Sequence, residues 1–180
     1  MQQTPRRVTH ALILLLGLVW IFLSTDKTGR ATSGNIPAPQ QGFQAPDFEL
    51  ITTTGEIIKL SDLQGQAVLV NLWATWCPPC RDEMRTIERI YLDYEEKGLV
   101  VLAVNMTYQD NEKQINPFIA EQGLTYPILL DKTGQMANAY QLKSLASSYF
   151  IDRAGLIREV VIGGPMAEAL LRTRVEEILK

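Results

Sequence analysis

Two runs of apolar residues dominate the middle of the chain. Residues 67–73 (AVLVNLW) and 99–106 (LVVLAVNM) contain almost no polar positions, which is typical of strands buried on both faces of a sheet. Between them, residues 82–98 place apolar side chains three or four positions apart and end in a glycine, which predicts a helix. A strand, a helix and a strand of these lengths predict a right-handed βαβ unit with parallel strands.

The second half of the chain predicts a mixed sheet with helices on both faces, an α/β fold. Pro117 lies inside one predicted helix, so this helix should either kink at the proline or begin late. A short turn, RAG, separates the last two predicted strands and favours an antiparallel hairpin. The predicted elements are a helix over 111–123, a strand over 125–130, strands over 147–152 and 156–162, and a helix over about 166–179.

The N-terminal segment contains a longer apolar run than the two predicted strands. Val8 to Leu23 is nearly free of polar side chains and follows Arg6 and Arg7, which predicts one transmembrane helix acting as a signal-anchor. A cleaved signal peptide is the alternative, but no small-residue cleavage site follows the apolar run closely. The two arginines place the N-terminus in the cytoplasm. We therefore expect a single-pass protein of the cell membrane whose folded part lies outside the cytoplasm.

These patterns divide the chain into three parts. Residues 1–24 form the cytoplasmic tip and anchor, residues 25–42 are rich in Ser, Thr, Gly, Pro and Gln and predict a flexible linker, and residues 43–180 predict one folded domain. The chain carries a formal net charge of −3, so it lacks the basic excess that attracts nucleic acid.

The chain has two cysteines, Cys77 and Cys80, separated by Pro78 and Pro79. A disulfide that closes so short a loop contributes little as a brace, since it hardly restricts the unfolded chain. The pair follows a predicted strand and opens a predicted helix, where unpaired N–H groups and the helix dipole stabilise a thiolate. We therefore predict thiol-disulfide exchange, with Cys77 as the attacking thiolate, Cys80 as the resolving thiol and no cofactor beyond their redox-active disulfide.

Three other interpretations use the same cysteines. A closed zinc site needs four ligands, and the only histidine, His10, lies in the predicted anchor, so a metal site within one chain is disfavoured. A thiol peroxidase of the peroxiredoxin-like type would use Cys77 alone as the attacked thiolate, with Cys80 resolving. A non-enzymatic docking or metal-binding module is the third interpretation.

From Phe43 onward the chain resembles the TlpA/ResA family of membrane-anchored, thioredoxin-like thiol-disulfide oxidoreductases. The resemblance is carried by APDFEL (45–50), LSDLQGQAVLVNLWATWCPPCRDE (60–83), LVVLAVN (99–105), YPILLDKTGQMANAYQL (126–142) and YFIDRAGLIRE (149–159). It implies a thioredoxin-like fold with an added N-terminal β-hairpin, here LITTTGEIIKL. It also implies reduction of protein disulfides outside the membrane, for example in apocytochrome c during cytochrome c maturation, and re-reduction by a membrane protein fed by cytoplasmic thioredoxin.

The resemblance also assigns roles to single positions near the cysteines. Asn71 stands where thioredoxins keep a buried Asp, and Glu83 matches the acid that ResA-type proteins place after the motif. Three residues beyond Cys80 on a helix, Glu83 faces the same side and can exchange a proton with the resolving thiol. The alternative for Glu83 is a solvated acid favoured only by the helix dipole. Trp73 is expected in the core.

The remaining expected site residues form the surface that meets a substrate. We expect Trp76, Pro78 and Pro79 at the rim beside Cys77. Leu145 and Ala146 occupy the loop in which the family normally carries a cis-proline, with Ala146 in place of that proline. Because a cis bond before a non-proline residue costs about 3 to 4 kcal/mol, we expect either a trans bond or visible strain at Leu145–Ala146.

Overall fold

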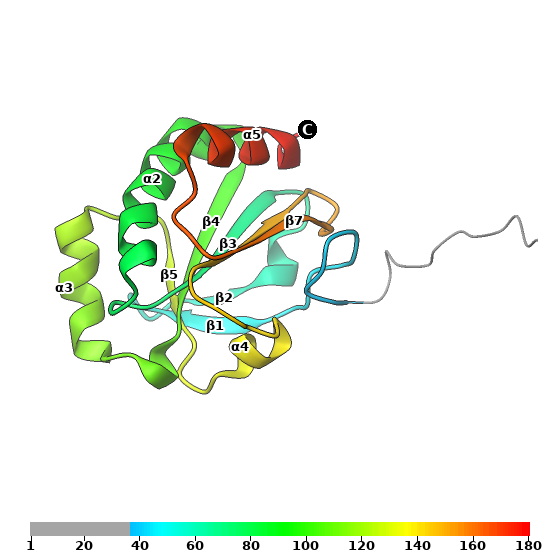
Figure 1. The fold of residues 1–180 in the computed structure, drawn as a ribbon. Helices are drawn as coiled ribbons and strands as arrows, with labels where there is room; N and C mark the ends of the chain where they lie inside the picture. Colours follow the sequence, from blue (N-terminus) through cyan, green and yellow to red (C-terminus); the bar gives the residue numbers. More distant parts are fainter. Residues whose placement is uncertain (1–36) are drawn as a thin grey trace, which may run out of the picture. The chain divides into compact units, whose positions relative to one another are not determined.

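The computed structural model describes residues 37–180, which form a seven-stranded mixed sheet flanked by helices (Figure 1). The elements are β1 (Glu49–Thr52), β2 (Ile57–Lys59), β3 (Ala67–Trp73), α2 (Pro78–Tyr94), β4 (Leu99–Asn105), α3 (Glu112–Gln122), β5 (Ile128–Leu130), α4 (Gln135–Ala139), β6 (Ser147–Ile151), β7 (Ile157–Ile162) and α5 (Glu168–Ile178), with short 3-10 turns η2 (Leu60–Leu63), η3 (Glu95–Lys97) and η4 (Thr107–Gln109).

The strand order is β2-β1-β5-β4-β3-β6-β7. Strand β3 pairs in parallel with β4, which pairs in parallel with β5, and the other neighbours are antiparallel. The predicted βαβ unit and the β6–β7 hairpin are therefore confirmed, as is the N-terminal hairpin of β1 and β2. Strand β3 lies inside the sheet, between β4 and β6, and its C-terminal end leads directly to the cysteines.

Two apolar clusters cover the two faces of the sheet. Consecutive residues of β3, such as Leu69 and Val70, belong to different clusters, because successive side chains of a strand point to opposite faces. Helices α2, α3 and α5 pack on one face, while η2 and α4 pack on the other. Burial on both faces explains the run that predicted this strand, in which Asn71 is the one polar residue.

Three helices differ in their bounds or presence from what the sequence predicted. Helix α3 begins at Glu112 and runs through Pro117, so the late start is wrong. The side chain of Asn111 caps this start by accepting the N–H of Lys113 at 3.2 Å. Helix α5 begins at Glu168, two residues later than expected, and the short α4 was not predicted.

The predicted anchor, including His10, lies outside the described residues, as does the predicted linker up to residue 36. Within residues 37–180, every helix is too short or too polar to span a bilayer.

Candidate active site

Cys77 and Cys80 form a disulfide at the N-terminus of α2, with their Cα atoms 5.3 Å apart. Cys77 is the N-cap residue, so Pro78 and Pro79 occupy the first turn, where their missing N–H groups cost no helical hydrogen bond. The Sγ atom of Cys77 accepts the N–H of Cys80 at 3.3 Å. The N–H of Cys80 thus points at the sulfur of Cys77, in the direction that would favour a thiolate in the reduced protein.

A groove of about 440 Å³ lies beside the disulfide. The groove is lined by Trp76, Cys77, Pro78, Pro79, Tyr108, Gln109, Leu142, Lys143, Ser144 and Leu145. Cys77 lines it and is 3% exposed, whereas Cys80 is fully buried. The geometry therefore offers Cys77, and not Cys80, to a partner.

Trp76 forms one side of this groove with a side chain that is 56% exposed. Its indole N–H donates to the carbonyl of Gln109 at 3.1 Å, which ties the rim to the loop after β4. Trp73, by contrast, is fully buried and stacks on Phe118, as expected for a core residue.

The Leu145–Ala146 peptide bond is cis, so the trans alternative is wrong. Leu145 lines the groove with Cys77, but the side chain of Ala146 is buried beneath it in the same apolar cluster as the two cysteines. The carbonyl of Ala146 accepts the N–H of Gly163 at 2.7 Å. Of the two residues expected to meet a substrate here, the structure brings only Leu145 to the groove.

Glu83 is a buried acid and is only 1% exposed, so the interpretation as a solvated residue is wrong. Its Oε1 atom accepts the N–H of Met166 at 3.0 Å, and its Oε2 atom lies 3.4 Å from Nδ2 of Asn71. Burial raises the pKa of Glu83, and these two hydrogen bonds oppose that rise without cancelling it. Such a carboxyl group can hold a proton at a pH where an exposed glutamate is ionised.

The contacts of Glu83 with Asn71 and Met166 were not predicted from the sequence. Asn71 also donates to Oγ of Ser148 at 2.9 Å, and both residues are 1% exposed. They are direct cross-strand partners in β3 and β6. The pattern of β6 contained one signal for this contact, since two buried serines begin a strand whose other residues are aromatic or apolar.

A second missed cluster lies beside Trp76. Asp110 accepts the N–H of Thr75 at 2.7 Å, the hydroxyl of Thr75 at 2.5 Å and the amide of Asn105 at 2.8 Å. Burial alone would raise the pKa of Asp110, but the hydrogen bonds from Thr75, Asn105 and Asn111 outweigh burial and lower it. Asp110 therefore links the residues before the cysteines to the loop after β4.

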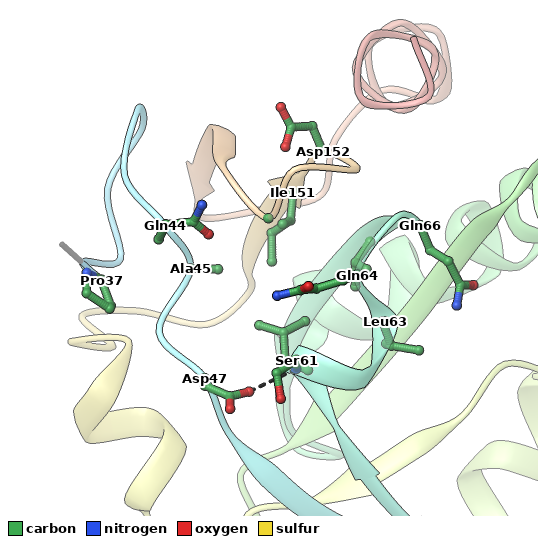
Figure 2. Close-up of a pocket in the computed structure, with 13 residues that line it drawn as sticks. Pro37, Gln44, Ala45, Asp47, Ser61, Leu63, Gln64, Gln66, Ile151 and Asp152 are labelled. Atoms are coloured by element: carbon green, nitrogen blue, oxygen red, sulfur yellow. Dashed lines mark hydrogen bonds between the residues drawn. The ribbon is translucent and has the colours of Figure 1, made fainter. Parts of the chain in front are cut away.

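Another pocket, of about 240 Å³, lies at the opposite end of β3 (Figure 2). Its two acids already accept main-chain N–H groups: Asp47 from Ser61 at 2.9 Å, and Asp152 from Ala154 and Leu156 at 2.9 Å. No cysteine lines this pocket, and its acids serve to join loops, so we assign it no reaction.

The sequence is similar to known proteins over most of its length. The sequence matches the AhpC/TSA family over residues 42–160. The chain belongs to this family. It is 39% identical over 161 residues to the thiol-disulfide oxidoreductase ResA of Oceanobacillus iheyensis, covering 87% of this chain and 80% of the relative. It is 45% identical over 125 residues to the thioredoxin-like protein YneN of Bacillus subtilis, covering 69% and 72%.

Solved structures with a similar fold include other proteins of thiol-disulfide exchange. A putative thiol:disulfide interchange protein DsbE from Chlorobium tepidum superposes with a TM-score of 0.72 and 31% identity, covering 78% of this chain and 99% of the other. StoA from Bacillus subtilis gives a TM-score of 0.64 and 28% identity, covering 72% and 96%. The fold is therefore thioredoxin-like, and the protein is a thiol-disulfide oxidoreductase of the TlpA/ResA type.

Proposed function

We propose that this protein reduces disulfides of other proteins outside the cytoplasmic membrane, with Cys77 and Cys80 as its reacting groups. The observation that carries this proposal is the pair's position: Cys77 caps α2 and lines the groove, while Cys80 is buried behind it. A nucleophile that a partner can reach, followed by a shielded resolving thiol, is what exchange with a large substrate requires.

The reaction proceeds in two exchange steps. The thiolate of Cys77 attacks one sulfur of a substrate disulfide, forming a mixed disulfide and releasing the other substrate sulfur as a thiolate. Cys80 then loses its proton and attacks Sγ of Cys77, which forms the Cys77–Cys80 disulfide and releases the second substrate thiolate. Two electrons pass from the enzyme to the substrate, and the two released thiolates take up protons.

Glu83 serves as the proton acceptor for Cys80 in the second step. It lies one helical turn beyond Cys80, on the same side of α2, and its buried carboxyl group has a raised pKa. Asn71 does not ionise, so it cannot accept this proton in place of the aspartate of thioredoxins. The proton then leaves Glu83 when the disulfide is reduced again.

The groove holds the substrate chain. Trp76, Pro78, Pro79 and Leu145 line the groove together with Cys77, and Ala146 is buried in the same apolar cluster as the cysteines. The CxxCH disulfide of an apocytochrome c is the proposed substrate, and a membrane protein supplied by cytoplasmic thioredoxin is the proposed electron donor. A membrane anchor in residues 1–24 would keep the domain beside such a donor.

A redox titration of the full-length chain tests this function. Alkylation of Cys77 and Cys80 is followed against defined dithiothreitol ratios, with Cys77→Ser and Cys80→Ser as controls. A reversible two-electron transition at a strongly negative potential supports a reductant, whereas a weakly negative potential indicates an oxidant. Absence of a reversible transition, or consumption of hydroperoxide that depends on Cys77, would contradict the proposal.

A further inference from the structure

The connection between β7 and α5, residues 163–167, covers Glu83; we call it the cover segment. Met166 donates its N–H to Oε1 of Glu83 at 3.0 Å. A side-chain carbon added at Gly164 would lie 3.3 Å from Oε2 of Glu83 and 3.6 Å from Cβ of Ala146. The cover segment thus lies directly against both the acid and the loop before β6, which leaves Glu83 1% exposed.

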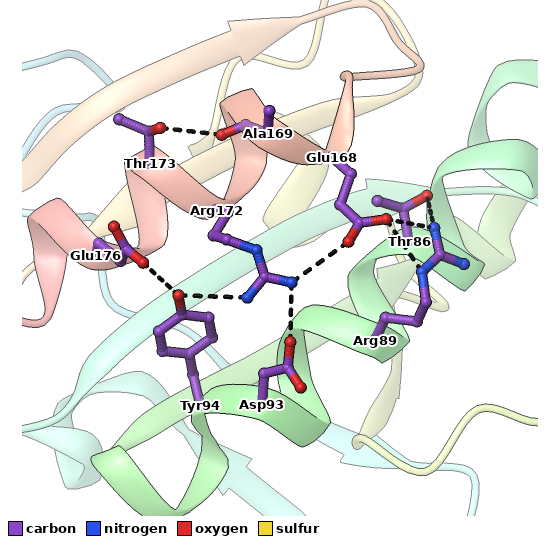
Figure 3. Close-up of polar contacts among 9 residues, drawn as sticks. All are labelled: Thr86, Arg89, Asp93, Tyr94, Glu168, Ala169, Arg172, Thr173 and Glu176. Carbon is purple, nitrogen blue, oxygen red and sulfur yellow. Dashed lines mark hydrogen bonds and ion pairs between the residues drawn. The ribbon is translucent and has the colours of Figure 1, made fainter.

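A network of charged residues ties the start of α5 to α2 (Figure 3). Glu168, two residues after Met166, accepts from Nε and Nη2 of Arg89 at 3.1 and 2.8 Å. Its other oxygen accepts from Nη2 of Arg172 at 3.3 Å, and the same nitrogen donates to Asp93 at 2.8 Å. Arg89 and Asp93 belong to α2, the helix that carries Glu83.

This network is not well suited to a purely stabilising role. The side chains of Arg89 and Glu168 are 56% and 41% exposed, and exposed ion pairs contribute little to folding stability. Their location is more informative. Because the cover segment is short, the position of the first turn of α5 determines where the N–H of Met166 lies.

We propose that Glu168 is a positioning residue of the exchange reaction: its ion pairs with Arg89 and Arg172 hold the cover segment over Glu83 and keep water from the carboxyl group. This inference rests on the proposed role of Glu83. Without the ion pairs, the first turn of α5 moves away from α2 more often, and water reaches Glu83 in the open states.

Burial is the largest influence on Glu83 and raises its pKa, whereas the hydrogen bond from Met166 acts in the opposite direction. Opening the cover segment weakens both effects. Because burial is the larger of the two, opening should lower the pKa of Glu83 toward its ordinary value of 4.5.

Apart from the two cysteines, the neighbouring charged groups leave Glu83 as the group that titrates here. Burial raises the pKa of Tyr126, and the charges of Glu88 and Glu83 raise it further, so Tyr126 stays neutral. Arg174 contacts the sulfur of Met166 at 3.4 Å and is paired with Glu159 at 2.7 Å. An arginine keeps its charge throughout the accessible pH range.

The test compares four variants of the full-length chain, Glu83→Gln, Glu168→Gln, Arg89→Gln and the control Glu112→Gln. Glu112 matches Glu168 because it also lies in the first turn of a helix, is 53% exposed and is ion-paired, with Lys132 at 2.7 Å. The rate at which each reduced protein reduces bis-hydroxyethyl disulfide is measured against pH. Melting temperatures are recorded in parallel.

We expect the wild-type profile to show an inflection that Glu83→Gln lacks. In Glu168→Gln and Arg89→Gln this inflection should move to lower pH by about half a unit, while Glu112→Gln matches the wild type. Melting temperatures of Glu168→Gln and Glu112→Gln should be similar. Since Arg89→Gln breaks the same contact from α2, it separates this effect from any change in the capping of α5.

Two different failures are distinguishable. If Glu83→Gln loses the inflection but Glu168→Gln and Arg89→Gln keep it unmoved or raised, the positioning role of Glu168 is wrong and the role of Glu83 stands. If Glu83→Gln has the wild-type profile, the proposed role of Glu83 itself is wrong, and the inference falls with it.

Discussion

Met166 and Glu83 are 83 residues apart in the sequence, yet the main-chain N–H of Met166 donates to Oε1 of Glu83 at 3.0 Å. The contact encloses a carboxyl group within the apolar cluster that contains both cysteines. A buried acid costs folding free energy when it ionises, because its hydration is lost. We therefore interpret Glu83 as a residue that serves the exchange reaction and lowers the free energy of unfolding.

Replacement of Glu83 by Gln tests this trade-off. A raised pKa in the folded state means that the contribution of Glu83 to stability is fully present below pH 4.5 and is lost as the pH rises through the folded value. Glu83→Gln should thus become more stable than the wild type as the pH increases, by on the order of 1 kcal/mol at pH 8. Urea unfolding between pH 4 and 8 measures the difference.

The same variant should lose activity. Without a proton acceptor for Cys80, closure of the Cys77–Cys80 disulfide should slow by about 100-fold, a typical effect of removing a general base. Stopped-flow mixing of reduced protein with excess disulfide measures this step. A variant that is less stable at pH 8 and closes its disulfide at the wild-type rate would contradict both expectations.

Asn71→Asp introduces a second acid beside Glu83. Nδ2 of Asn71 lies 3.4 Å from Oε2 of Glu83, and both residues are 1% exposed, so two carboxylates at this distance cannot both ionise. We expect a loss of about 2 kcal/mol of folding stability at pH 8 and a smaller loss at pH 4. The same substitution in the Glu83→Gln background should cost less, which a double-mutant cycle of urea unfolding measures.

The fold could be predicted from the sequence where burial leaves a strong pattern. Strands β3 and β4 are buried on both faces, so their apolar runs were unambiguous. Helix α4 has only five residues, fewer than two turns, and no periodicity can be recognised over that length. Helix α5 begins later than expected because Ala167, its N-cap residue, has an extended backbone with φ −62° and ψ 138°.

The residue pattern alone predicted only the local part of the active site, whereas Leu145, which lines the groove, was placed there by the family resemblance. Cys77 and Cys80 are close in sequence, and their place at the start of a helix follows from the elements around them. The burial of Glu83 depends on a segment about eighty residues away, and the contact of Asp110 with Thr75 spans 35 residues. Neither contact leaves a periodic signal, because each depends on how separate elements pack.

Asp110→Ala tests the cluster that connects Thr75 to the loop after β4. The lowered pKa of Asp110 means that its contribution to stability is present above pH 3.8 and is lost as the pH falls through the lower folded value. We expect a loss of about 1 to 2 kcal/mol at pH 7, because several donors lose a charged acceptor at a partly exposed site. Urea unfolding at pH 7 and pH 2.5 should show the difference shrinking in acid, and a loss independent of pH would contradict this account.

Trp76→Ala tests the wall of the groove. The ring is 56% exposed and lines the groove with Cys77, so it is available to contact a protein substrate. KM for a protein disulfide should rise about tenfold, the effect of losing one buried aromatic contact in an interface, while the rate with a small disulfide stays near the wild type. Leu92→Ala is the matched control, since Leu92 is 54% exposed on the same helix as the cysteines but does not line the groove. Equal effects of both substitutions, or a loss of activity toward the small disulfide, would show that Trp76 supports the fold of the site and does not bind substrate.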